Sequence, residues 1–563
     1  MYSPQVLILS IVLLGCAPAI PTVEAPADSG TPDTDTDTDV DTDTNVDTDT
    51  DTDTIEGEGG GRPVFSPDGG AFTEAVTVTL SASRGGEVWA CVAEPDDVCE
   101  LEAYTAPIVL TGSAVVHAQV GEERRARSFV ALDAEAMAFS SDVSVMVFWT
   151  DDSEPDSDTD VAMGLDVFEP AGEGKRTDFG AEPADSGRAR LHLRGSSSYG
   201  AAKPSYDLEL WEAGSTSDRG EALLGLPSNG DWVLYAPYYY DNALVRNSLA
   251  YALSNDIDQY APRTRPVELF LAERGSVVGM DDYRGVYILT EEIEPGADRV
   301  DITTMTPDDN AEPEVSGGYL FKRDRAGDRE DGFWAGDAGG QFSFSYPLVW
   351  VDPSERDVTD AQQDYLVALL DDLALALVSS DYTSPDSGLH YAEIIDLDSW
   401  IDHHILNVLF KNPDAFRLSG YMHKERGEPL AAGPMWDLDR TAGGNDYRAS
   451  DPTRWDASNL TYDTTFAFDF GWYGGMFEDP AFREVYWSRW AALLAGELSA
   501  EQVEARLDGL ADELREAAGR NSDRWGTPDF DGEIGGLKVW LRTRSEWIED
   551  CLERYDDPRT CPG

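Results

Sequence analysis

The sequence has few of the residues that build large metal clusters or bind nucleic acids. Its 563 residues include only five cysteines and six histidines, too few for an extended zinc or iron–sulfur framework. Basic residues are also scarce, because 41 Lys and Arg stand against 109 Asp and Glu, for a formal net charge of -68. Such a charge repels the phosphates of nucleic acids and anionic lipids, so the composition excludes non-specific binding to DNA or RNA.

The sequence also lacks a long apolar run. Residues 6–14 are apolar but far shorter than the roughly 20 residues that a membrane-spanning helix needs, and they indicate the core of a secretory signal. The residues that follow, Leu13-Leu14-Gly15-Cys16, resemble a bacterial lipobox. This resemblance implies a signal peptide over residues 1–15 and a diacylglycerol on the thiol of Cys16. We therefore expect a lipid-anchored protein of the cell envelope, on the extracytoplasmic side of a membrane.

The remaining cysteines form two pairs that are close in sequence. Cys91 is followed by Cys99, and Cys551 by Cys561. An oxidising compartment favours disulfides, so we expect one bond within each pair; four free thiols are the alternative. Neither pair has the short spacing that zinc sites usually take.

Residues 16–61 are predicted to form a disordered acidic tether. Within them, residues 22–61 contain fourteen acidic residues and no basic one, and Thr-Asp repeats dominate residues 33–54. Like charges repel, and the segment has no apolar face to bury. Calcium loops also alternate Asp, but they need a turn glycine and a closing glutamate at fixed positions, so a solvated spacer is the preferred interpretation.

Residues 62–135 are predicted to form a small β-domain. Strand-like runs cover residues 76–80, 88–92 and 114–120, with turn residues between them. Residues 63–72 and 106–110 resemble the chitobiase C-terminal-type β-sandwich, a module that accompanies secreted catalytic domains. The resemblance implies a spacer or a weak contact with glycan or cell wall, and no catalysis.

Residues 136–563 are predicted to form one α+β domain. Strand patterns come first, at residues 143–149, 189–193, 267–271 and 285–289. Helical patterns dominate later. An apolar helix face runs from Leu397 to Leu409 and is stopped by Pro413, and further helical patterns cover residues 483–497, 500–520 and 536–555.

Three clusters in this domain could carry chemistry. A Gly/Ser-rich loop at residues 194–200 precedes Lys203, an arrangement that can cradle phosphate, although a polar hairpin is the more frequent explanation of such a pattern. Asp414 lies just after the helix and could take a proton from a hydroxyl, or it could belong only to a helix-stop turn. Asp437 and Asp439 alternate along a segment predicted to be extended, which would put two carboxylates on one side for Mg²⁺ or Mn²⁺.

Two neighbouring histidines on the same helix are less informative. His403 and His404 occupy adjacent helix positions, so they cannot share one metal-binding face. We expect them to be structural or to line a substrate site.

Six sequence blocks in the right order resemble the spore-coat-protein-H (CotH) kinase family, over nearly all of residues 140–557. The blocks are the loop with Lys203, residues 231–251, 283–291 and 317–320, Lys411-Asn412-Pro413-Asp414-Ala415-Phe416-Arg417-Leu418-Ser419, and Gly433-Pro434-Met435-Trp436-Asp437-Leu438-Asp439. The resemblance implies an atypical protein-kinase-like fold, with members that transfer the γ-phosphoryl group of ATP to Ser of secreted or coat proteins.

The resemblance also implies roles for individual residues. Lys203 would contact the phosphates of ATP, and Glu291 would orient Lys203. Asp414 would be the catalytic carboxylate, Asp437 would hold Mg²⁺ or Mn²⁺, and Asp439 would be a second metal ligand.

The chain departs from the family pattern in two places. Some members have an asparagine a few residues after the catalytic Asp, where this chain has Arg417, Leu418 and Ser419. Either Asn412 or Asn445 could replace that asparagine. The Gly/Ser loop also lacks a G-x-G-x-x-G pattern.

Two functions from different classes follow. The first is an exported, lipid-anchored kinase that phosphorylates Ser or Thr of extracytoplasmic or surface proteins, which must obtain ATP where ATP is scarce. The second is a non-catalytic surface lipoprotein that uses the kinase-like fold as a binding or adhesion scaffold.

Overall fold

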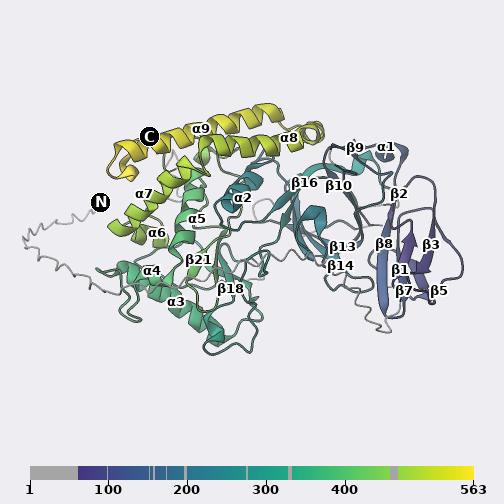
Figure 1. Ribbon diagram of the computed structural model, residues 1–563, viewed down its shortest axis with the longest axis horizontal. Coiled ribbons are helices and arrows are strands. Elements are labelled where there is room, and N and C mark those ends of the chain that lie inside the picture. Colours follow the sequence, from purple (N-terminus) through teal and green to yellow (C-terminus); the bar gives the residue numbers. More distant parts are fainter. Residues whose placement is uncertain are drawn as a thin grey trace, which may run out of the picture. The chain divides into compact units, whose positions relative to one another are not determined.

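The structure is a computed structural model with a mixed α+β fold, which confirms the predicted class (Figure 1). It describes residues 61–97, 99–150, 153–155, 159–172, 174–195, 200–273, 275, 277–327, 332–456 and 467–563. The predicted signal peptide, Cys16 and nearly all of the acidic tether lie outside the described residues. So do residues 196–199 of the Gly/Ser loop.

The first described region is made of two small sheets. Both contribute to one buried cluster that includes Phe65, Val78, Val116 and Phe129. The disulfide between Cys91 and Cys99 is formed here, as predicted. The likeness to the chitobiase-type sandwich stays a prediction. One sheet has the order β1 (Pro63–Ser66), β3 (Val76–Ala82), β6 (Ile108–Leu110), and the other β2 (Gly70–Phe72), β8 (Glu123–Ala131), β7 (Ala114–Val120), β4 (Trp89–Ala93), β5 (Glu102–Ala103).

A short helix, α1 (Ala134–Met137), leads from the two sheets into a closed seven-stranded barrel. Neighbouring strands are antiparallel except β10 and β16, which close the barrel in parallel. Because side chains alternate along each strand, one set fills the interior, where Phe148, Leu208 and Leu289 belong to a single buried cluster. The strands, in barrel order, are β10 (Ser144–Trp149), β11 (Val161–Phe168), β13 (Asp185–Arg194), β14 (Ser205–Trp211), β15 (Asp231–Tyr235), β17 (Tyr283–Glu291) and β16 (Thr264–Ala272). A separate two-stranded pair is β9 (Ser140–Ser141) with β12 (Thr177–Asp178).

A second sheet and the helices surround the largest core cluster. The sheet has the order β19 (Leu348–Asp352), β18 (Tyr319–Arg323), β20 (Gly420–Lys424), β21 (Leu430–Ala432). Helix α5 (Leu397–Leu409) matches the predicted helix, and the Asp396 carboxylate caps it by accepting a hydrogen bond from the Ser399 amide. The other helices are α2 (Arg246–Asp256), α3 (Asp360–Val378), α4 (Tyr391–Ile394), α6 (Gly471–Met476), α7 (Pro480–Ala495), α8 (Ala500–Trp525) and α9 (Phe530–Arg554).

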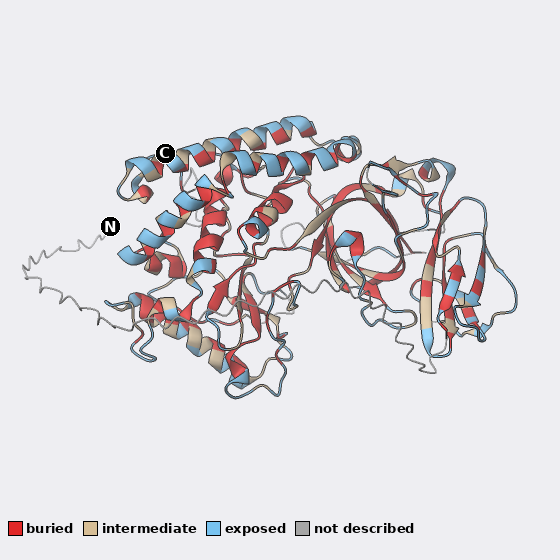
Figure 2. Cartoon of the chain, in the orientation of Figure 1, coloured by how far each residue is buried: buried red, intermediate tan, exposed pale blue. Residues whose placement is uncertain are grey.

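The last three helices share this core. Tyr486 and Trp490 of α7 and Leu541 of α9 are buried in the same cluster as helix α5. Figure 2 shows the pattern along α8 and α9, with buried residues on one face of each helix and exposed residues on the other. Aromatic faces of this size need a partner to bury against, and the partner is the core that also carries α5.

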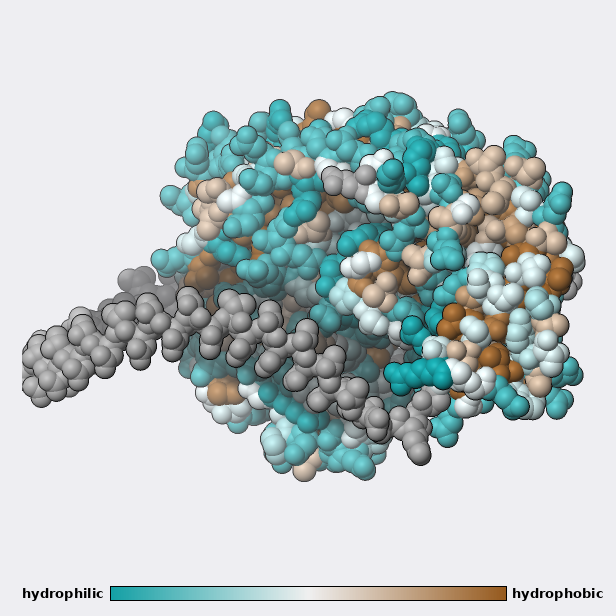
Figure 3. Space-filling model, turned by 45° about the vertical axis from the view of Figure 1, so that its right-hand side comes forward, coloured by the Kyte–Doolittle hydropathy of each residue, from teal (hydrophilic) through white to brown (hydrophobic). Residues whose placement is uncertain are grey.

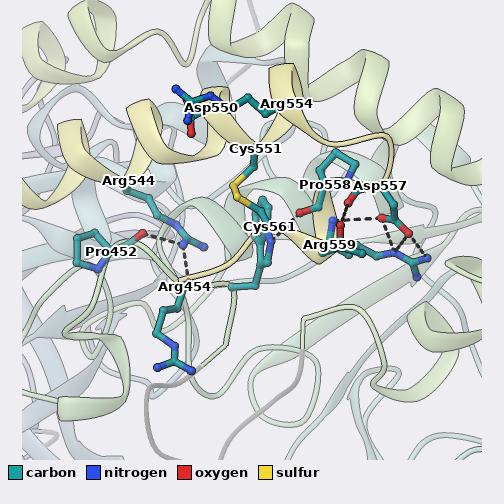
Figure 4. The surroundings of a disulfide bond; sticks show 12 residues. Pro452, Arg454, Arg544, Asp550, Cys551, Arg554, Asp557, Pro558, Arg559 and Cys561 are labelled. Carbon is teal, nitrogen blue, oxygen red and sulfur yellow. Dashed lines mark hydrogen bonds and ion pairs between the residues drawn. A yellow bond between two sulfur atoms is a disulfide. The ribbon is translucent and has the colours of Figure 1, made fainter.

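The C-terminal end of α9 is fastened covalently and by hydrogen bonds (Figure 4). Cys551 and Cys561 form the second predicted disulfide. Nearby, the buried Arg544 guanidinium donates to the carbonyls of Val408, Pro452 and Arg454, at 2.7 to 3.0 Å. The end of helix α5 is therefore held by the C-terminal helix.

On the face drawn in Figure 3 the hydrophobic residues form scattered patches among hydrophilic ones. Among the described residues, no helix combines the length and the apolar character needed to cross a membrane.

Candidate active site

Asp414 lies in a tight turn directly after helix α5. Lys411 and Phe416 have positive φ angles of 51° and 65°, which fold the chain back on itself. The Asp414 amide donates a hydrogen bond of 3.0 Å to Oδ1 of Asn412, and its side chain keeps 19% of its surface exposed. The turn thus ends the helix and also presents a carboxylate, whose catalytic role stays a prediction.

Two arginines hold the Asp414 carboxylate. Arg417 donates to Oδ1, and Arg448 Nη1 donates to the same oxygen at 3.0 Å. Arg448 is held in turn by Asp446, with 2.6 Å between Nη2 and Oδ2. These carboxylates raise the pKa of Arg448 further above its usual value. The orientation of Asp414 is therefore fixed by a buried charge network.

The segment that carries Asp437 and Asp439 is a loop, so the prediction of an extended segment is wrong. Asp437 has a φ angle of +60°, which breaks the alternation of side chains. Helix α2 holds the loop in this form. The Asp437 amide donates to the Tyr251 hydroxyl at 3.1 Å, and the Leu438 amide donates to Oδ1 of Asn247 at 2.7 Å.

The two carboxylates are nevertheless close enough to influence each other. Burial and then the charge of Asp437 raise the pKa of Asp439 well above its usual value. The pKa of Asp437 is raised to about 6, because the surrounding protein desolvates it and because Asp414 and Asp324 add negative charge. By surface area Asp437 nevertheless remains exposed to solvent. The structure thus brings together Asp414, Asp437 and Asp439.

Ser419 and Asp324 also belong to this group, although the sequence analysis gave neither of them a role. Ser419 Oγ lies 3.4 Å from Oδ2 of Asp437 and 3.5 Å from Oδ2 of Asp324, so one hydroxyl joins two carboxylates. Asp324 follows strand β18, and Lys322 Nζ is 4.0 Å from its Oδ2. Strand β18 pairs with β20, which begins directly after Ser419, and this pairing brings Asp324 to the site.

Lys203 is buried among acceptors of the protein itself. Its Nζ donates to the Pro237 carbonyl at 3.0 Å, to Oδ1 of Asn521 at 2.9 Å and to the Val286 carbonyl. Only 1% of its surface is exposed, and burial lowers the pKa of its amine well below the usual value. All three amine hydrogens therefore have acceptors, and a contact with nucleotide stays a prediction.

Glu291 contacts Arg263, although the family resemblance implies a contact with Lys203. Its carboxylate lies 2.7 Å from Nη2 of Arg263, and it also accepts from the Arg263 amide at 2.8 Å and from the Tyr260 hydroxyl at 3.4 Å. The structure does not bring Glu291 and Lys203 together as an ion pair.

Of the histidines and asparagines considered above, His403 and His404 are buried, Asn412 is half-buried and Asn445 is exposed. His404 is buried between the Tyr486 hydroxyl at 2.7 Å and the Ala467 carbonyl at 2.6 Å, which is a structural role. Asn412 donates from Nδ2 to Oδ1 of Asn407 at 2.9 Å, and the Asn445 amide donates to the Tyr240 carbonyl at 3.1 Å.

The carboxylates suit a hard cation of the kind that phosphate-handling sites use. Within the described ranges, no three His, Cys, Asp or Glu side chains converge on one metal position. Mg²⁺ beside phosphates is usually held by only one or two carboxylates, and phosphate oxygens and water complete its shell. Asp437 and Asp439 provide carboxylate oxygens in that number.

Comparison with known families identifies the family of this chain. A family model described as CotH kinase protein matches residues 191–548, which is more than half of the chain. The chain belongs to the CotH kinase family. The CotH match contains Lys203, Glu291, Asp414, Asp437 and Asp439, and it begins within strand β13 of the barrel. No curated protein is similar enough to match the chain.

Proposed function

We propose that this CotH-family protein transfers the γ-phosphoryl group of ATP to Ser or Thr hydroxyls of extracytoplasmic or surface proteins. The observation that carries the proposal is the convergence of Asp414 with Asp437 and Asp439 inside the region of the family match. The three residues come from two separate loops. Phosphoryl transfer depends on positioning and charge neutralisation more than on covalent chemistry, and fixed carboxylates serve both.

Asp414 is proposed to orient the acceptor hydroxyl and to take its proton. Oδ1 is occupied by Arg417 and Arg448, whereas Oδ2 has only a contact of 3.4 Å with Arg448 among the described residues. Oδ2 is thus the oxygen that a hydroxyl would approach. The two guanidinium groups keep the carboxylate in place while it does so.

Asp437 and Asp439 are proposed to hold Mg²⁺ or Mn²⁺ together with the ATP phosphates. When bound, the cation would neutralise phosphate charge. Even without a cation, negative charge is concentrated at this site, because the carboxylates of Asp414 and Asp324 both raise the pKa of Asp437. A divalent cation relieves this repulsion. Lys203 remains the proposed contact to the phosphates, and Glu291 is proposed to orient Lys203. Both roles would require Lys203 to leave its present acceptors.

The proposed place of action is the cell envelope, with a lipid anchor on Cys16 and the acidic segment as a tether. Two disulfides support an oxidising compartment. The two N-terminal sheets would act as a spacer or make a weak contact with glycan or cell wall, and the ATP would have to be supplied locally.

The test is transfer of radiolabel from [γ-³²P]ATP, with Mg²⁺ or Mn²⁺, to the protein itself and to casein as a general Ser/Thr acceptor. Asp414→Asn should lower transfer by about 10²–10⁴-fold, because an amide cannot take the proton. Asp398→Asn changes an exposed carboxylate at the start of α5 and should leave transfer unchanged. Full transfer by Asp414→Asn would reject this catalytic role. No transfer and no ATP binding by the wild type would leave the binding-scaffold hypothesis in its place.

A further inference from the structure

Polar side chains gather on one face of strands β18 and β20, beside the loop that carries Asp437. Lys322 of β18 lies directly opposite Tyr421 of β20, and its Nζ is 5.8 Å from the centre of the Tyr421 ring. Asp324 lies on the same side, with its Oδ2 4.0 Å from Lys322 Nζ. Ser419 Oγ then joins Asp324 to Asp437. Lys322 and Tyr421 therefore border the proposed metal ligand.

The hydroxyl of Tyr421 has no hydrogen-bond partner among the described residues. Only 5% of the Tyr421 surface is exposed, yet its hydroxyl oxygen reaches solvent. Four charged groups act on this hydroxyl, and they are two cations, Lys322 and Arg194, and two carboxylates, Asp324 and Glu292. Polar groups in so enclosed a position almost always have a partner. The hydroxyl is thus able to donate a hydrogen bond to a bound molecule.

Arg194 approaches the same place from the barrel. It is the last residue of β13, and its guanidinium carbon lies 5.5 Å from the centre of the Trp436 ring, next to Asp437 in the chain. Nη1 lies 2.6 Å from Asp207 and 3.0 Å from Glu292. Nε and Nη2 donate no hydrogen bond within the described ranges, and 21% of the side chain is exposed. The two carboxylates fix the guanidinium and leave two of its nitrogens as donors.

We propose that Tyr421, Lys322 and Arg194 bind the phosphate groups of ATP beside the cation held by Asp437. The Tyr421 hydroxyl and the two nitrogens of Arg194 would donate hydrogen bonds to phosphate oxygens, and the Lys322 ammonium would neutralise their charge. This inference rests on the proposed kinase function, and it adds three residues to which the family resemblance assigns no role.

The charges around these residues link phosphate binding to the metal. Three carboxylates pair with the two cations, so the group as a whole is negative. Phosphate alone is therefore repelled, whereas a divalent cation on Asp437 would reverse this balance. The phosphates of ATP would then contact the metal on one side and the three donors on the other.

Lys322 is better placed for this contact than Lys203. The amine of Lys203 already donates to three acceptors of the protein, and 1% of the residue is exposed. The side chain of Lys322 is 23% exposed. A phosphate contact by Lys322 therefore needs no rearrangement of the buried hydrogen bonds that hold Lys203.

The test is calorimetric titration of the full chain with tripolyphosphate and with ATP, each in the presence of Mg²⁺. Tyr421→Phe removes only the unpartnered hydroxyl, so it should fold as the wild type does. It should weaken binding of both ligands by about tenfold, because a hydrogen bond to a charged group is lost. Lys322→Met should also weaken both by about tenfold or more. Arg325→Gln removes a positive charge at an exposed position of the same segment, beside the Tyr346 ring, and should leave both affinities unchanged.

Tripolyphosphate separates this inference from the kinase proposal. If the wild type binds tripolyphosphate but not ATP, and Tyr421→Phe weakens that binding, the phosphate site stands and the kinase proposal fails. If the wild type binds ATP and both folded variants bind the two ligands as tightly as it does, the inference is overturned and the kinase proposal stands. The inference is also overturned if the wild type binds neither ligand, or if Arg325→Gln weakens binding as much as Lys322→Met does.

Discussion

Lys203 and Asn521 are joined by a buried hydrogen bond of 2.9 Å from Nζ to Oδ1, although they lie at opposite ends of the family match. The same Oδ1 accepts the amide of Val286 at 3.1 Å. One asparagine on helix α8 thereby connects strand β17 to the lysine that precedes strand β14. The lysine that the family resemblance assigns to ATP phosphates is, in this structure, a tie between the barrel and the C-terminal helices.

Lys203→Met should lower the free energy of unfolding by about 2–4 kcal/mol, because it leaves buried acceptors without a donor. Chemical denaturation measures this, and Lys175→Met at an exposed position should show no change. A Lys203→Met protein of wild-type stability that has lost ATP binding would contradict a structural role and favour the phosphate contact.

Arg448→Gln should reduce the rate of phosphoryl transfer through misorientation of Asp414. We expect kcat to fall by about tenfold or more while the KM for ATP stays within about twofold, since the change removes the guanidinium that contacts both Asp414 and Asp446. Arg448→Lys should recover part of kcat, and Arg454→Gln, at an exposed position, should behave as the wild type. Equal losses in stability and in both kinetic constants would instead indicate general damage to the fold.

Asp166 should make stability depend on pH. This residue of β11 is fully buried, and burial raises its pKa to about 7, although Ser128 donates to it at 2.8 Å. An acid whose pKa is raised by folding binds more protons in the native state than in the unfolded state. The contribution of Asp166 to the free energy of unfolding is therefore present below about pH 4, and it is lost as the pH rises towards 7.

Asp166→Asn should remove that dependence. Relative to the wild type, the free energy of unfolding of the variant should rise by up to about 4 kcal/mol between pH 4 and pH 8. Denaturation at a series of pH values measures the difference, with the exposed Asp512→Asn as control. A wild type and variant that change in parallel with pH would refute the assignment.

The disulfide between Cys551 and Cys561 should stabilise the end of helix α9. Replacement of both cysteines by serine should lower the free energy of unfolding by about 2–3 kcal/mol, the value that the loop-entropy model gives for so short a loop. Peptide mapping without reductant should find this linkage and the Cys91 to Cys99 linkage in the wild type. Free thiols at all four positions in exported protein would contradict both bonds.

The sequence predicts the helices better than it predicts how the strands associate. The apolar positions of α5 and α7 recur at helical spacing, so the periodicity alone indicates which faces are buried. The closure of the barrel depends on the parallel pairing of β10 with β16, and no local pattern specifies a partner so distant in the chain. Strand patterns indicate that a segment pairs, but they do not indicate its neighbour.

The candidate site could likewise be predicted only in part from the sequence. Asp414 and Asp437 were found because each lies in a recognisable sequence block. The arrangement around them was not predicted, since Arg448 and Asp324 reach the site through the fold and not through their spacing in the sequence. Alternation breaks at Asp437 because the loop amides donate hydrogen bonds to helix α2 and the residue takes a positive φ angle.

The most direct test of the central claim is calorimetric binding of ATP to the full chain in the presence of Mg²⁺ or Mn²⁺. We expect that the wild type binds ATP only with the metal, that Asp437→Asn loses this binding, and that Asp414→Asn keeps it. This contrast separates a metal ligand from a residue that acts on the acceptor hydroxyl. A wild type that binds no ATP with either metal, or an Asp437→Asn protein that binds ATP and metal as the wild type does, would contradict the account.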